Sequence, residues 1–208
     1  MTRLSKATLD DLTREPGRLT LAAAPHGVDA RVLAQLLGDA RRPVLHIARD
    51  DSRLGQLADL VRFFHPEADI LALPAWDCLP YDRVSPNPEL SARRMATLAA
   101  LSRSPAAPRL VLTTVNAALQ RVPPRDWVAG QSFAAQPGDA IDMDALTGFL
   151  TANGYARASQ VTEPGEYAVR GGLVDIYPTG GDQPVRLDFF GDELDTIRTF
   201  DPASQRTT

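Results

Sequence analysis

The sequence contains little cysteine, little lysine and no long apolar run. The single cysteine, Cys78, excludes an internal disulfide and fits a reducing compartment. No segment approaches the roughly 20 apolar residues of a membrane helix, and the opening MTRLSKATLDDL lacks the apolar centre of a secretory signal. We therefore expect a cytoplasmic chain without a membrane anchor.

Basic residues are fewer than acidic ones, and almost all of the basic residues are arginine. The 22 basic residues face 26 acidic ones, which gives a formal net charge of -4, and Lys6 is the only lysine. Tight nonspecific DNA binding needs many neutralised phosphates, so direct contact with DNA is not expected. Arginine offers a planar fork suited to carboxylates, although a GC-rich genome gives the same bias.

The first half of the chain predicts an α/β domain, residues 1–125. Strands alternate with helices there, which is typical of βαβ units around a parallel sheet. Asp50 or Asp51 is a suitable N-cap for the helix at 51–64. The expected strands cover 18–24, 43–48, 70–73 and 109–114, and the expected helices cover 1–16, 28–37, 51–64, 90–101 and the start of 115–120.

The pattern changes after Pro123 and Pro124, and residues 126–208 predict a small α+β domain. Consecutive strands without helices between them indicate an antiparallel sheet. Gly191 and Asp192 fit a two-residue hairpin turn that needs a positive φ. A helix is expected at 143–153, with strands near 131–135, 155–160, 166–170, 173–177, 185–190 and 193–200.

The turn at Pro25, His26, Gly27 and Asp29 occupies the place of a phosphate loop in a nucleotide-binding domain. A working loop reads GxxxxGK[ST], in which amides and a lysine hold the phosphates. This turn has one glycine, no lysine and an acidic residue where an anion would sit. It therefore predicts a degenerate loop that does not bind nucleotide, with weak anion binding at the helix N-terminus left open.

No other residues outline a catalytic or metal site. His26, His46 and His65 are far apart and lack the local spacing of metal ligands. Cys78 has no cysteine partner, and a buried inert thiol is the simpler interpretation. We expect no metal and no cofactor, and we expect this chain not to be an enzyme.

The strand at 185–190 predicts a surface of mixed character. Its period of two places Arg186, Asp188 and Phe190 on the face opposite Val185, Leu187 and Phe189. An aromatic residue beside an arginine is the composition of interface hot spots. The competing interpretation is that the helix at 143–153 covers Phe190, and the strand pattern alone does not decide between the two.

Two long segments, 73–101 (LPAWDCLPYDRVSPNPELSARRMATLAAL) and 163–207 (EPGEYAVRGGLVDIYPTGGDQPVRLDFFGDELDTIRTFDPASQRT), resemble a known family. They are similar to the UvrB-homology module at the N-terminus of transcription-repair coupling factors. The excision-repair helicase UvrB shares that module and is the competing assignment. UvrB, however, keeps an intact phosphate loop and carries a long DNA-gripping hairpin after its equivalent of Pro80–Asp82, for which this chain has no room.

The resemblance implies a module for recruiting a repair protein in transcription-coupled nucleotide excision repair. It implies UvrA as the partner, with Arg170, Arg186 and Phe190 as the contact residues and each arginine paired with a UvrA carboxylate. It also implies that Thr208 precedes the segment that completes the first domain, the ATP-dependent DNA translocase motor, and downstream domains that contact this module. The alternative is a fragment of a UvrB-type, ATP-dependent enzyme of damage recognition.

Overall fold

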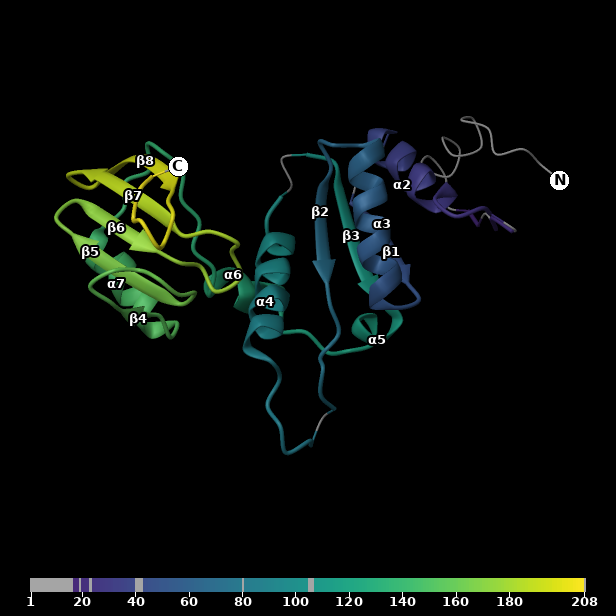
Figure 1. Ribbon diagram of the computed structural model, residues 1–208, viewed down its shortest axis with the longest axis horizontal. Coiled ribbons are helices and arrows are strands. Elements are labelled where there is room, and N and C mark those ends of the chain that lie inside the picture. The colour runs from purple at the N-terminus through teal and green to yellow at the C-terminus, as the bar shows by residue number, and fades with distance from the viewer. Residues whose placement is uncertain are drawn as a thin grey trace. The chain divides into compact units, whose positions relative to one another are not determined.

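The computed structural model describes residues 17–18, 20–22, 24–39, 43–79, 81–104 and 107–207 (Figure 1). The chain divides into two compact units. The first comprises Met1–Leu90 and Thr97–Pro123, and the second comprises Ser91–Ala96 and Pro124–Thr208. Six residues in the middle of a helix thus group with the second unit, which the sequence did not indicate.

The first unit is built on a parallel sheet, as predicted. The sheet has the order β1-β3-β2, with β1 (Val44–Ala48) and β2 (Asp69–Leu73) flanking β3 (Arg109–Thr114). Every residue of the central strand β3 is buried, because neighbours on both edges and both faces enclose it. The helices of this unit are α2 (Val28–Asp39), α3 (Asp51–Phe64) and α5 (Val115–Ala118), and the residues of α4 (Pro88–Ser102) are divided between the two units.

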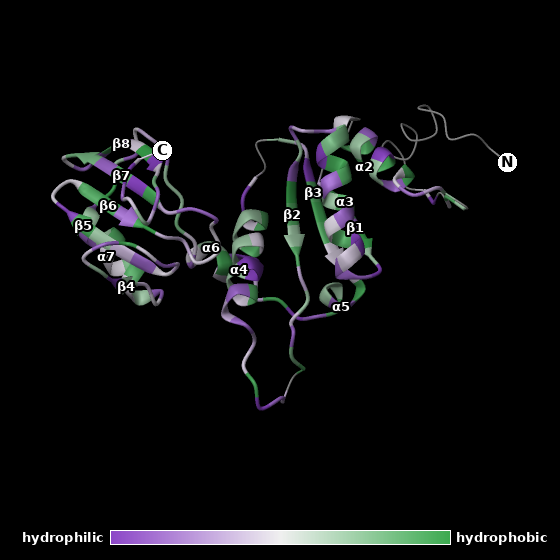
Figure 2. Ribbon diagram, viewed as in Figure 1, coloured by the Kyte–Doolittle hydropathy of each residue, from purple (hydrophilic) through white to green (hydrophobic). Residues whose placement is uncertain are grey.

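Helices α2 and α3 bury their apolar sides against this sheet (Figure 2). The N-cap of α3 is Asp50, whose Oδ1 accepts a hydrogen bond from the backbone N–H of Arg53 at 2.8 Å. This confirms the predicted cap, which stabilises such a helix by about 1 kcal/mol. The buried core consists of Ala30, Leu33, Leu37, Leu57, Ala58, Val61, Leu110 and Leu112.

The strand expected at 18–24 is not found. Its described residues, Arg18, Thr20–Ala22 and Ala24, form no strand, and Leu21 is 38% exposed. An apolar run becomes a strand only when a neighbouring edge takes its backbone hydrogen bonds, and none of the described strands pairs with it. The helix expected at 1–16 lies outside the described residues.

The second unit contains a five-stranded sheet of order β4-β5-β6-β7-β8. Strands β5 to β8 are antiparallel, as expected, but β4 pairs in parallel with β5, so the sheet is mixed. The loop between β4 and β5 brings the chain back in the same direction, which sequence pattern alone does not reveal. The elements are α6 (Arg125–Gly130), α7 (Met143–Ala152), β4 (Ala156–Arg157), β5 (Glu166–Arg170), β6 (Leu173–Ile176), β7 (Val185–Phe190) and β8 (Glu193–Thr199).

The strand expected at 131–135 is absent, and the short helix α6 precedes that stretch instead. The backbone after it meets the sheet at Ala140, which bridges Glu193, and the N–H groups of Gly138 and Ile141 donate to the carbonyl oxygens of Leu194 and Asp192. The hairpin between β7 and β8 is confirmed, since Phe190 pairs with Glu193. Gly191 supplies the positive φ, at +65°. Asp192, the second residue of the turn, does not have a positive φ, as in a type II′ turn.

Helix α7 covers one face of the second sheet. The residues buried beneath it alternate along the strands, so the remaining strand positions point to the opposite face. No described helix is long and apolar enough to cross a membrane. The core of this unit consists of Leu146, Leu150, Tyr167, Val174, Ile176, Leu187, Phe189 and Leu194.

Candidate protein-docking site

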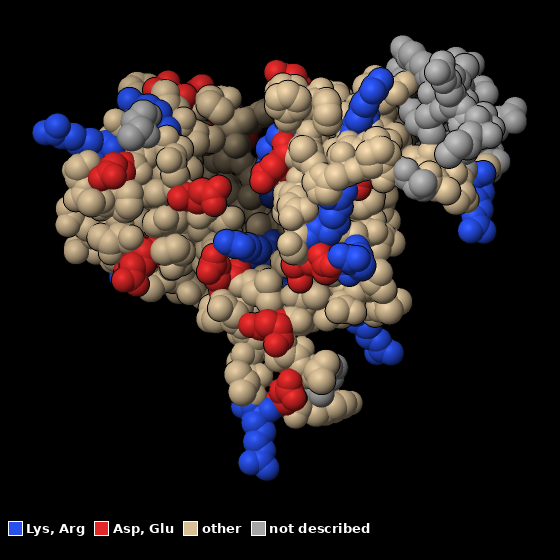
Figure 3. Space-filling view, turned by 45° about the vertical axis from the view of Figure 1, so that its right-hand side comes forward, with Lys and Arg blue, Asp and Glu red and all other residues tan. Residues whose placement is uncertain are grey.

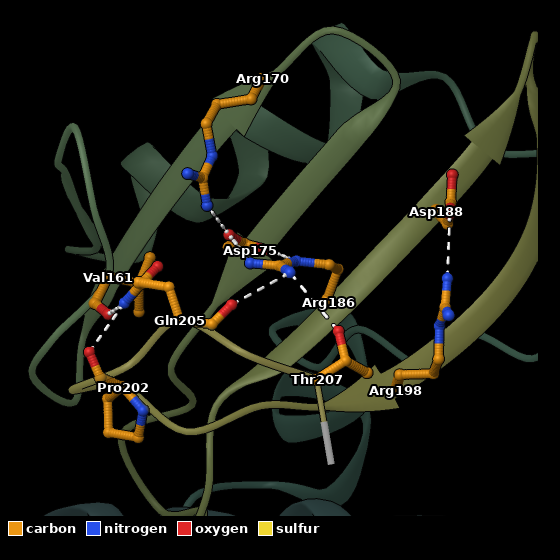
Figure 4. A network of polar contacts seen from close by, with 9 residues as sticks. All are labelled: Val161, Arg170, Asp175, Arg186, Asp188, Arg198, Pro202, Gln205 and Thr207. Atoms are coloured by element: carbon orange, nitrogen blue, oxygen red, sulfur yellow. Dashed lines mark hydrogen bonds and ion pairs between the residues drawn. The ribbon is translucent and has the colours of Figure 1, made fainter.

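The sheet face opposite α7 is organised around a buried carboxylate, Asp175 on β6 (Figure 4). Its side chain is 1% exposed. Arg186 lies directly opposite on β7 and donates twice, from Nε to Oδ1 at 2.7 Å and from a terminal nitrogen to Oδ2 at 2.9 Å. Arg170, the last residue of β5, donates to Oδ2 at 2.5 Å. Two predicted site residues therefore meet on one carboxylate.

The two arginines determine the charge state of Asp175. Burial by itself raises the pKa of Asp175, but the hydrogen bonds from Arg186 and Arg170 outweigh it and hold that pKa below its ordinary value. The same hydrogen bond raises the pKa of Arg186. The cluster therefore contains two positive charges and one negative charge.

Arg186 is also held from other sides. Its guanidinium carbon lies 4.7 Å from the centre of the Phe200 ring, and its second terminal nitrogen approaches the carbonyl oxygen of Gln205 at 3.4 Å and the hydroxyl of Thr207 at 3.5 Å. The side chain is 14% exposed. Arg186 is thus enclosed by its own chain.

Arg170 and Phe190 are the accessible members of the predicted set. The side chain of Arg170 is 43% exposed, and Phe190 is 85% exposed at the end of β7. The interpretation in which helix α7 covers Phe190 is wrong, because α7 packs on the Leu187 and Phe189 face. A phenylalanine of this exposure, on the same sheet face as Arg186, is suited to insertion into a partner.

The glycines after Arg170 fix where β5 turns into β6. Gly171 has a φ of +59°. A Cβ on Gly172 would lie 2.8 Å from the carbonyl oxygen of Phe189, so only glycine fits there. The backbone N–H of Phe189 donates to the Gly172 carbonyl oxygen at 2.8 Å. This close approach ties the Arg170 corner to the strand that ends in Phe190.

A second ion pair on this face joins β7 to β8. Asp188 lies on the same face of β7 as Arg186 and Phe190, and it accepts a hydrogen bond from Arg198 of β8 at 3.2 Å. Both side chains are solvated, at 36% and 50% exposure, so the pair contributes little to stability. Figure 3 shows one side of the chain, on which acidic and basic residues are interspersed without one dominant sign.

The turn at Pro25–Asp29 has a different arrangement. Gly27 has a φ of +88°, and the backbone N–H of Val28 donates to the Pro25 carbonyl oxygen at 3.2 Å as α2 begins. Asp29 accepts from the Ala30 N–H at 2.9 Å and forms an ion pair with Arg53 of α3.

Arg53 also connects Asp29 to His26. Its other terminal nitrogen lies 2.9 Å from His26 Nε2. Burial raises the pKa of Asp29, yet the contacts with Arg53 and Ala30 outweigh it and lower that pKa overall. A carboxylate thus stands at the N-terminus of α2, where it opposes a bound anion. That this turn does not bind nucleotide stays a prediction.

Asp175 and Phe200 were missed at the sequence level. One signal was available for Asp175, which stands between Val174 and Ile176 in a strand, a place where aspartate is rare unless it is paired. Both arginines bind Asp175 within the chain, and the expectation that each arginine pairs with a UvrA carboxylate stays a prediction. In the described residues, no group of three or more potential metal ligands gathers.

Residues 133–208 match the family model of the UvrB interaction domain. The same residues contain the Asp175 cluster and Phe190.

Among curated proteins, the chain is similar to transcription-repair-coupling factors. It is 38% identical to that of Escherichia coli, covering 92% of this chain and 16% of the relative. It is 38% identical to that of Myxococcus xanthus, covering 85% and 15%, and 28% identical to that of Bacillus subtilis, covering 87% and 16%. The chain therefore spans about a sixth of the length of these relatives.

Proposed function

The chain is homologous to transcription-repair-coupling factors and matches the UvrB interaction domain, and from this premise we propose that it is a docking module that recruits UvrA in transcription-coupled nucleotide excision repair. The module acts by binding rather than by turning over a substrate. Its binding residues are Phe190 and Arg170, with Arg186 supporting them.

The exposed Phe190 is the observation that carries this proposal. Phe190 is 85% exposed although it lies on a strand whose neighbours Leu187 and Phe189 are buried. Aromatic side chains and arginine are both enriched in the buried centres of protein interfaces. Its place within residues 133–208 supports a role in the interaction that names the family.

The chemistry of the face indicates what UvrA offers in return. Phe190 needs an apolar pocket. Arg170 needs a carboxylate of the partner, because two arginines share the single negative charge of Asp175 and one positive charge remains unbalanced. We expect UvrA to present an acidic group close to an apolar recess.

The proposal is tested by measuring the affinity of purified UvrA for this chain and for its Phe190→Ala variant. We expect Phe190→Ala to weaken binding about 30-fold, the loss typical of an aromatic anchor. The thermal midpoint should hardly change because the side chain is solvated. Phe63→Ala is the matched control, since Phe63 is 78% exposed on α3 of the first unit.

Equal affinities of the parent, Phe190→Ala and Phe63→Ala for UvrA would overturn the docking role. An equal loss in both variants would also count against it, because the effect would then follow lost surface rather than this site. A UvrB-type enzyme is distinguished by titration with a fluorescent ATP analogue, where saturable micromolar binding would favour the enzyme.

A further inference from the structure

The buried Asp175 is costly to the fold and asks for an explanation. A carboxylate removed from water loses several kcal/mol unless it is paired, and a well-packed apolar residue is often no less stable than a buried ion pair. Asp175 is 1% exposed and lies between Val174 and Ile176, both of which pack beneath α7. Stability alone therefore gives no reason for an acid at this position.

Arg186 balances the negative charge of Asp175. Two of its nitrogens bind Asp175, and the third approaches Gln205 and Thr207. With 14% exposure and its ring contact to Phe200, it has little surface to offer a partner. Arg186 and Asp175 together form a neutral unit inside the face.

Arg170 supplies the excess charge. It adds a second guanidinium to a carboxylate that Arg186 already neutralises, and its side chain is 43% exposed. In the described part of the chain, one terminal nitrogen of Arg170 donates to Asp175. The rest of the guanidinium fork stays available to solvent.

A fixed arginine binds at lower entropic cost than a free one. An arginine side chain has about 2 kcal/mol of rotamer entropy, and preorganisation reduces the part that is lost on association. The contact with Asp175 holds Arg170 in place before the partner arrives. Its neighbour Gly172, pressed against the Phe189 backbone, keeps this corner next to the strand of Phe190.

We propose that Asp175 is a positioning residue of the docking face, which holds Arg170 in its binding orientation from inside the sheet and uses Arg186 as its permanent counter-ion. This inference rests on the proposed UvrA-binding function. Asp175 itself does not touch the partner.

The first test compares Asp175→Asn with Asp188→Asn. Each variant removes one carboxylate from the same sheet face and so raises the net charge equally, but Asp188 pairs with Arg198 and not with Arg170. We expect Asp175→Asn to weaken UvrA binding about 10-fold, whereas Asp188→Asn should stay within about 2-fold. Similar losses in both variants would overturn the positioning role.

A double-mutant cycle separates positioning from a purely structural effect. Asp175→Asn is measured in the parent and in an Arg170→Ala background, at a temperature where thermal unfolding shows both proteins folded. If Asp175 acts through Arg170, its loss should fall from about 10-fold to about 2-fold or less in that background. The same loss in both backgrounds would mean that Asp175 serves only the fold, and the inference would be wrong.

The Arg170→Lys variant gives a third test, which remains valid even if Asp175→Asn does not fold. It retains the charge at a partly exposed position but lacks the planar fork that Asp175 orients. We expect most of the Arg170→Ala loss to recur. Affinity within about 2-fold of the parent would overturn the inference, because charge without orientation would then suffice.

The outcomes also distinguish this inference from the function beneath it. Unchanged UvrA binding by Phe190→Ala and Arg170→Ala together would remove the docking function itself. Weakened binding by those two variants, with an additive Asp175→Asn effect, would remove only the positioning role.

Discussion

Both units contain an ion pair between aspartate and arginine, but the balance of charge differs between the two. In the first unit, Asp29 at the start of α2 binds Arg53 of α3. In the second, Asp175 in the middle of a sheet binds Arg186 and Arg170. The first pair is balanced, with one charge of each sign, while the second has one arginine in excess.

The surroundings of the carboxylate explain the difference. Asp29 stands at a helix N-terminus, 34% exposed, and water and a backbone N–H share its charge. Asp175 has no access to water, and so its charge has to be met by guanidinium groups alone. A buried carboxylate can thus gather two arginines on one face, and a solvated one needs only a single partner.

The largest expected difference concerns stability. Arg186→Ala leaves a buried carboxylate with a single arginine, and we expect the free energy of unfolding to fall by roughly 3 kcal/mol. Arg53→Ala frees a carboxylate that water reaches, and we expect roughly 1 kcal/mol or less. Chemical denaturation followed by circular dichroism measures both. Equal losses would erase the contrast between the two pairs.

The next expected effect concerns partner binding by arginines of one face. Arg170→Ala should weaken UvrA affinity about 10-fold, because the partner loses a charge-assisted hydrogen bond. The matched control is Arg198→Ala, since Arg198 is 50% exposed on the same face and its charge is balanced by Asp188. Binding measured by calorimetry should change less than about 3-fold in that control. A larger loss for Arg198→Ala would shift the site toward β8.

Acid should separate the two carboxylates further. The pKa of Asp175 and that of Asp29 are both lowered in the fold, so each contributes stability that is present above the unfolded pKa of about 3.9 and is lost as the pH falls through the folded pKa. Because three hydrogen bonds from guanidinium groups hold Asp175, the stability difference between the parent and Asp175→Asn should shrink below about pH 4. The corresponding difference for Asp29→Asn should change less over the same range, as thermal midpoints against pH would record.

The smallest expected effect is the response to nucleotide. Asp29 occupies the anion position of the loop and is already paired with Arg53, and we expect no saturable micromolar binding of a fluorescent ATP analogue. The docking face serves as an internal comparison, because its affinity for UvrA should not change when ATP is added. Saturable ATP binding would bring the first unit back into line with an active nucleotide-binding domain.

Local patterns predicted much of the fold because their causes are local. The helix expected at 51–64 has those bounds, since its cap Asp50 and its apolar spacing act within a few residues. The alternation along 185–190 and the turn at Gly191 were likewise readable. The strand expected at 131–135 failed because an extended run needs a neighbouring edge, which no local pattern specifies.

Most residues of the candidate site could be identified from the sequence, but the contacts among them could not. The resemblance supplied Arg170, Arg186 and Phe190, and the exposure of Phe190 and of Arg170 fits a docking role. It did not show that Arg186 is enclosed, nor that Asp175 joins the two arginines. These contacts link β5, β6 and β7 across the sheet, and strand register sets them.

The sequence by itself determined that Arg186, Asp188 and Phe190 share one side of a strand, because backbone pleating has a period of two wherever a strand forms. Only the tertiary structure decided that α7 covers the other side and that Asp175 lies opposite Arg186. Which face is covered, and which residues pair across strands, depends on packing between distant segments, and no short stretch of sequence contains that information.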